Sequence, residues 1–132
     1  MMKEGMQDLL LAAGKTACYV LCIIRISEQV NGKDSDVVRD IQRLIDAKLV
    51  TYEKGNNFYV ADAGACLTLL TGKKYKVREE APGYKAKPGE HLIERWVLGK
   101  GLHFQMSDWR PMMVSNTVNT GKLQSYRVLA AV

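Results

Sequence analysis

The sequence predicts an α+β fold in which amino-terminal helices, one of them central and buried, pack on a carboxy-terminal antiparallel sheet. Apolar residues recur at helical spacing up to about residue 48, and from Leu49 onward they form short runs separated by turn-forming residues. Helices followed by consecutive hairpins favour this class over alternating strands and helices. Because 47% of the 132 residues are hydrophobic, we expect a single domain spanning residues 1–132.

Three segments account for the predicted helices at the amino-terminal end. The spacing of apolar residues predicts a short helix over residues 3–13 and a second helix from a Thr16 cap to about Val30. The second is apolar around most of its circumference, which is typical of a buried helix. A third helix, capped by Asp34 or Ser35, is predicted to continue to about residue 47.

The remaining elements are mostly strands bounded by glycine, asparagine and proline. We expect strands over residues 49–53, 58–61, 74–78, 92–98, 102–106 and 122–131. Asp62 is expected to cap a short helix that continues to Leu70 and is closed by Gly72. Residues 81–89 contain Pro82 and Pro88 and form the one loop long enough to be functional.

Charge and cysteine content predict a cytoplasmic protein without a membrane span. The apolar runs are far shorter than the roughly 20 residues that cross a bilayer, and Glu4 and Asp8 interrupt any secretory signal. Three cysteines at irregular spacing make a poor disulfide framework, so a reducing compartment is expected. The net charge of +5 permits contact with phosphates or acidic surfaces without requiring it.

Cysteine and histidine spacing matches no zinc motif. Cys18 and Cys22 lie four residues apart, whereas His91 and His103 lie twelve apart. We therefore expect neither a metal nor an organic cofactor.

Cys18 is the strongest candidate for a reactive residue, because of its position in the predicted buried helix. It falls in the first turn of the predicted buried helix, where unpaired backbone N–H groups favour a thiolate over a thiol. His103 alternates with apolar neighbours on a predicted strand and is a candidate base, and Asp108 is a candidate to orient its ring. The plainer interpretation is that Cys18 fills core space and Asp108 caps a turn, as we expect of Cys22 and Cys66 in the core.

Short motifs in three parts of the chain carry a family resemblance. They are TACYVLC at residues 16–22, GLHF at residues 101–104, and SNTV at residues 115–118 with GKLQSYRV at residues 121–128. With the intervening helix and hairpin, the chain resembles the papain-like cysteine peptidase superfamily. More narrowly, it resembles the small bacterial and phage-borne proteins akin to bacteriocin-leader peptidases.

The resemblance implies a cysteine hydrolase that acts on a peptide or another amide. In that case Cys18 is the nucleophile, His103 the general base and Asp108 the orienting acid, with Asn116 as the alternative orienting residue. The chain departs from the family pattern at Ala17, where glycine is common, and in the short step from His103 to Asp108. It also lacks a glutamine just before Cys18. These departures fit a non-catalytic member nearly as well as an active one.

The first alternative is a non-catalytic protein-binding module of the same fold, for example a phage or mobile-element protein acting on a host factor. Aromatic, methionine and arginine side chains are enriched at interface cores. The residues of this kind that stand together are Trp109, Arg110, Met112 and Met113. Anchoring of this segment in the core is the competing interpretation.

The second alternative is DNA binding by residues 35–72, where a helix, a hairpin and a short helix resemble a winged helix. The helix carries Asp36, Asp40 and Asp46 against Arg39 and Arg43, so it has no surplus positive charge for a phosphate backbone. A peptide or protein is therefore the expected partner ahead of nucleic acid, and no membrane association is expected.

Overall fold

The computed structural model describes residues 18–52, 58–98, 101–109 and 121–132. Its helices are α2 (Cys18–Asn31), α3 (Val37–Asp46) and α4 (Ala63–Thr71). Its strands are β1 (Val50–Tyr52), β2 (Phe58–Val60), β3 (Tyr75–Glu80), β4 (Glu90–Leu98), β5 (Gly101–Gln105) and β6 (Lys122–Ala131). Within these residues the helices precede the larger sheet, and both sheets are antiparallel, so the predicted α+β class is confirmed.

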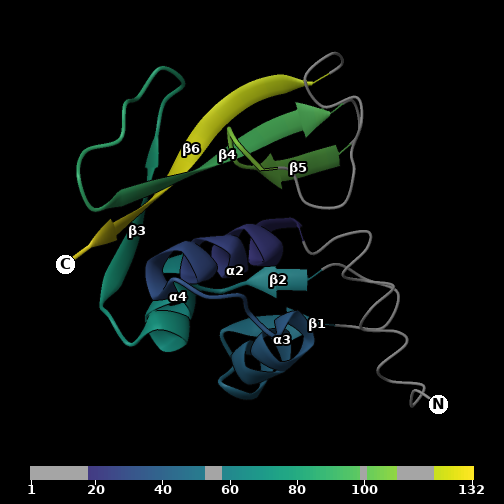
Figure 1. The fold of residues 1–132 in the computed structure, drawn as a ribbon. Coiled ribbons are helices and arrows are strands. Elements are labelled where there is room, and N and C mark those ends of the chain that lie inside the picture. The colour runs from purple at the N-terminus through teal and green to yellow at the C-terminus, as the bar shows by residue number, and fades with distance from the viewer. Residues whose placement is uncertain (1–17, 53–57, 99–100, 110–120) are drawn as a thin grey trace.

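The larger sheet lies over α2, with α3 and α4 on the other side of that helix (Figure 1). Its strand order is β3-β6-β4-β5, while β1 and β2 form a separate hairpin. The final strand β6 therefore lies between β3 and β4, and β5 is an edge strand. This order leaves one edge of the sheet beside the beginning of α2, where Cys18 lies.

The core is centred on α2, as its apolar circumference predicted. Ile23 has no exposed surface, and its helix packs between the sheet and the other two helices. Cys22 and Cys66 are also fully buried, which confirms the expectation that they belong to the core. The other fully buried large side chains come from α2, α3, α4 and the strands, and include Ile26, Leu44, Leu67, Ile93 and Leu129.

The two faces of the larger sheet have different roles. Phe104 of β5 stacks on Tyr19 of α2 with ring centroids 4.3 Å apart, which defines the inner face toward the helices. Side chains alternate along a strand and directly paired residues share a face. Glu94, which pairs with Gln105, and Trp96, which pairs with His103, therefore leave the sheet on the outer face.

Side-chain capping corrects one predicted boundary and confirms another. The cap of α3 is Asp36 rather than Asp34 or Ser35, because its carboxylate accepts a hydrogen bond from the Arg39 N–H at 3.2 Å. Asp62 caps α4 by accepting from the Ala65 N–H at 3.0 Å, as predicted. The predicted helix over residues 3–13 and the Thr16 cap lie outside the described residues.

Strands β3 and β4 reach further toward their connecting loop than predicted, to Glu80 and from Glu90. The carboxylate of Glu90 holds that loop in place: it accepts hydrogen bonds from the Tyr84 hydroxyl at 2.6 Å and the Lys87 N–H at 2.9 Å, and it pairs with Arg78 at 2.8 Å.

No helix among the described residues is long and apolar enough to span a membrane.

Removing the Glu90 carboxylate is expected to lower the melting temperature at neutral pH and to flatten its dependence on acid. Hydrogen bonds from Tyr84 and Lys87, together with Arg78, lower the pKa of Glu90 from 4.5 to about 2. A lowered folded-state pKa means that the stabilisation is complete above about pH 4.5 and disappears as pH falls toward 2. Thermal unfolding of wild type and Glu90→Gln should therefore differ at pH 7 and converge near pH 2. A constant difference across this range would contradict the network.

Candidate functional site

Cys18 meets the histidine-bearing strand at the edge of the sheet. It is the first residue of α2, and its Sγ accepts a hydrogen bond from the Phe104 N–H of β5 at 3.4 Å across 86 residues of sequence. Phe104 directly follows His103 in the chain. The structure thus brings the candidate nucleophile to the strand of the candidate base, a contact that no local sequence pattern encodes.

The electrostatic environment of the thiol differs from the sequence-based expectation. Burial raises the pKa of Cys18 above its ordinary value of 9.0, and this effect outweighs the backbone N–H groups of Phe104, Tyr19 and Cys18, which lower it. The backbone N–H groups therefore favour the thiolate as expected, but the net shift of the pKa is toward the thiol. Partial burial of Cys18 disfavours the charged form of its sulfur.

His103 leaves β5 on the outer face of the sheet. Its side chain is 3% exposed, and the residue pairs with Trp96 of β4. Its neighbour Phe104 packs on Tyr19 at the inner face. Cys18 therefore contacts the backbone of β5, whereas the imidazole extends from the face turned away from Tyr19.

Asp108 lies at the tip of a tight turn. Met106 and Trp109 close this turn with a pair of backbone hydrogen bonds of 2.8 and 3.3 Å, and Asp108 is exposed. The position agrees with its interpretation as a turn residue. Asn116, the alternative orienting residue, lies outside the described residues.

Trp109 is half-buried and anchors the turn to the core. Its ring packs against the buried cluster, and the guanidinium of Arg25 lies 5.9 Å from its centroid. This arrangement favours core anchoring over a protein contact for Trp109. The other predicted contact residues, Arg110, Met112 and Met113, lie outside the described part of the chain.

A groove of about 540 Å³ opens at Tyr19, the residue that follows Cys18; Cys18 itself does not line it. It lies between the start of α2, the β2–α4 junction and the inner face of the sheet, and the stacked rings of Tyr19 and Phe104 line it. Val77 and the pair formed by Glu79 and Arg127, 2.6 Å apart, contribute the β3–β6 wall. Sequence reasoning missed these residues, because Glu79 and Arg127 become neighbours only through the β3–β6 register.

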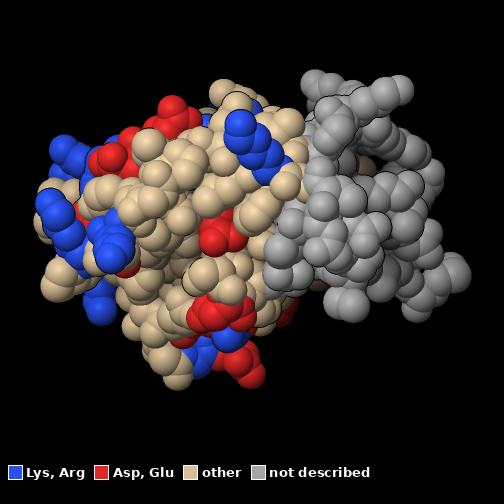
Figure 2. Space-filling model, turned by 90° about the horizontal axis from the view of Figure 1, so that it is seen from above, with Lys and Arg blue, Asp and Glu red and all other residues tan. Residues whose placement is uncertain are grey.

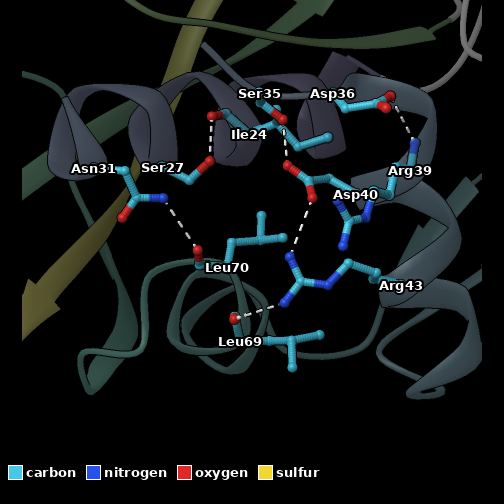
Figure 3. A network of polar contacts seen from close by, with 10 residues as sticks. All are labelled: Ile24, Ser27, Asn31, Ser35, Asp36, Arg39, Asp40, Arg43, Leu69 and Leu70. Atoms are coloured by element: carbon cyan, nitrogen blue, oxygen red, sulfur yellow. Dashed lines mark hydrogen bonds and ion pairs between the residues drawn. The ribbon is translucent and has the colours of Figure 1, made fainter. Parts of the chain in front are cut away.

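A second, polar pocket of about 390 Å³ lies where the α2–α3 loop meets α3 and α4. Figure 3 shows its hydrogen bonds: Arg43 of α3 reaches Asp40 at 3.2 Å and the Leu69 carbonyl of α4 at 3.4 Å. Asn31 of α2 donates to the Leu70 carbonyl at 3.1 Å. These contacts tie the three helices together.

The same contacts bear on the winged-helix alternative. The helix and hairpin that it requires are present as α3 and the β1–β2 pair. However, Arg43 is bound to Asp40 and to the backbone of α4, and α3 also carries Asp46. Part of the positive charge of α3 is therefore paired within the protein.

Comparison with known proteins adds no family to these observations. Among the described residues, no group of three His, Cys, Asp or Glu side chains is arranged to hold a metal ion. No family model matches the chain, and no curated protein and no solved structure is significantly similar to it.

Proposed function

We propose that the chain is a protein-binding module that keeps a papain-like order of elements without turning over a substrate, and that the groove at Tyr19 receives a segment of its partner. The observation that carries the proposal is the contact of the partly buried Cys18 thiol with the Phe104 N–H, on the opposite side of β5 from the imidazole of His103. Burial raises the pKa of this thiol from its ordinary value of 9.0, which disfavours the thiolate. A cysteine hydrolase needs the thiolate, formed with a base within hydrogen-bond reach.

The position of His103 supports the absence of turnover. Its ring leaves β5 on the outer face, whereas the sulfur contacts the Phe104 N–H. In a working pair the imidazole would take the proton from sulfur directly. The arrangement instead makes Cys18 a contact between α2 and β5.

The groove supports binding. Its volume of about 540 Å³ falls within the range of about 300–1,000 Å³ that is usual for ligand sites. Phe104, Tyr19 and Val77 supply apolar and aromatic contact area, which dominates interface energetics. Glu79, 63% exposed at its side chain and paired with Arg127, adds a polar rim. A partner segment with an apolar side chain between polar ones matches this lining.

Alkylation of the cysteines by iodoacetamide tests the absence of turnover. We expect Cys18 to label slowly at pH 7, without the rise in rate below pH 8 that an activated thiolate would show, because burial raises the pKa of its thiol. His103→Ala should leave this profile unchanged. Mass spectrometry resolves each site, and the buried Cys22 and Cys66 serve as internal controls for opening of the fold.

Fast labelling of Cys18 well below pH 8 that disappears in His103→Ala would contradict the proposal and favour the peptidase. A His103→Gln variant controls for the case in which His103→Ala changes the labelling only by disturbing the fold.

A separate experiment tests the groove: any partner captured by wild type should be retained by Cys18→Ala and lost by Val77→Arg. Leu102→Arg, at a 52% exposed position outside the groove lining, is the matched control and should retain it.

A further inference from the structure

A second cluster lies on the outer face of the sheet around Glu94. One carboxylate oxygen of Glu94 accepts hydrogen bonds from the Trp96 indole N–H at 3.0 Å and from the Gln105 amide at 3.4 Å. Tyr126 of β6 pairs directly with Glu94, so its ring leaves the same face. Seen from the side of the sheet, most of the described surface is uncharged, with scattered acidic and basic side chains (Figure 2). We name Glu94, Trp96, Gln105 and Tyr126 the Glu94 cluster.

Glu94 of this cluster has donors but no cationic partner among the described residues, and the oxygen of Gln105 has no donor. Among the described residues, no basic side chain pairs with Glu94. Gln105 is only 2% exposed, and its Oε1 has no hydrogen-bond partner. A flipped amide would not relieve this, because it would turn the oxygen toward the carboxylate. A buried acceptor left in this way costs free energy that a donor from outside can recover.

The same face shows how this protein holds a guanidinium. Arg78 of β3 pairs with Glu80 and with Glu90, each at 2.8 Å, and its guanidinium lies 5.3 Å from the centroid of the Tyr84 ring. Carboxylate oxygens and an aromatic ring thus surround Arg78. The Glu94 cluster contains a carboxylate, an amide oxygen and two aromatic side chains, but the described residues place no arginine among them.

We propose that the Glu94 cluster binds the guanidinium of an arginine side chain from a partner protein. The carboxylate of Glu94 pairs with one edge of the guanidinium, the Gln105 oxygen accepts from it, and Trp96 or Tyr126 stacks on its plane. Arginine fits better than lysine because its planar group donates in several fixed directions and stacks on aromatic rings.

Binding involves a movement of Trp96. The Gln105 oxygen is covered in the free chain, and the half-buried Trp96 indole is hydrogen-bonded to the same carboxylate. An incoming guanidinium competes with the indole N–H for Glu94, so this N–H reports directly on occupancy. The cluster lies on the opposite face from the groove, and therefore either proposal can fail without the other.

Titration with the peptide acetyl-Gly-Arg-Gly-amide, followed by ¹⁵N–¹H NMR of the indole groups, tests the site. We expect a saturable shift of the Trp96 indole N–H, with the Trp109 indole as internal control. The corresponding citrulline peptide should cause no saturable shift, and the lysine peptide should bind more weakly. Glu94→Gln should weaken binding by about tenfold or more, as expected for loss of a charge-assisted pair. The matched variant Glu28→Gln, on α2, should bind like wild type.

Three results would overturn the proposal: no saturable shift of Trp96, the same shift with the citrulline peptide, or unchanged affinity in Glu94→Gln. Equal affinity for the lysine peptide would overturn the choice of a guanidinium. Gln105→Leu provides a second variant if Glu94→Gln loses its dispersed spectrum. It removes the unpartnered oxygen at similar size, and it should weaken binding while preserving the fold.

Discussion

Ile23→Ala is expected to lower the free energy of unfolding by about 2–5 kcal/mol, the range for truncating a large buried aliphatic side chain. Ile23 has no exposed surface and lies in the helix that packs between the larger sheet and the other helices. Domains of this size are stable by about 5–15 kcal/mol in total. The substitution should therefore remove a large fraction of the stability, measured by chemical denaturation.

Ile23→Val is the graded control and should cost about 0.5–1.5 kcal/mol, because it removes a single methylene. Truncation of Leu102, which is 52% exposed, should change stability little. If Ile23→Ala costs no more than Leu102→Ala, then α2 is not the centre of the core. Such a result would also argue against the packing of α2 that we infer holds Cys18 against β5.

Gly64→Ala is expected to destabilise the protein by about 2–3 kcal/mol even though alanine is the better helix former by about 1 kcal/mol. Gly64 lies in the first turn of α4, where a Cβ atom would come within 2.8 Å of the Tyr75 carbonyl oxygen and 2.9 Å of the Lys76 Cα. Both obstacles are backbone atoms of β3. Neither can turn away as a flexible side chain would, so α4 and β3 must separate.

Leu69→Ala, at a 37% exposed position of the same helix, controls for effects on α4 itself and should cost less than Gly64→Ala. Calorimetric melting of both variants gives the comparison. A stabilised Gly64→Ala would mean that helix propensity outweighs the close approach and that α4 does not touch β3 as described. The groove wall formed by Val77 and Glu79 of β3 depends on this contact.

The two proposed binding surfaces use opposite faces of one sheet. The groove faces α2 and α4 and contains Phe104 and Arg127, whereas the Glu94 cluster extends from the outer face. One partner that contacted both would have to pass around an edge of the sheet. Val77→Arg and Glu94→Gln therefore separate the two surfaces, because each changes one face and leaves the other intact.

Much of the fold could be predicted from local patterns. The apolar circumference of residues 19–26 indicated the buried helix, and the Asp62 and Gly72 caps bounded α4 as predicted. The terminal strand over residues 122–131 was also placed correctly. These features depend on side-chain period, capping and turn chemistry, which act over a few residues and are therefore legible in the sequence.

The candidate site depends on contacts between distant segments, which could not be predicted from the sequence alone. The sequence placed Cys18 at the start of a helix and His103 on a strand, and both positions are confirmed. Tertiary packing determined that the sulfur meets the Phe104 N–H, that burial raises the pKa of the thiol, and that the imidazole leaves the opposite face from Phe104. It also brought together Glu79 with Arg127 and Glu94 with Gln105 through strand register. Periodicity and caps are local properties, whereas desolvation and cross-strand neighbours arise only when distant segments meet.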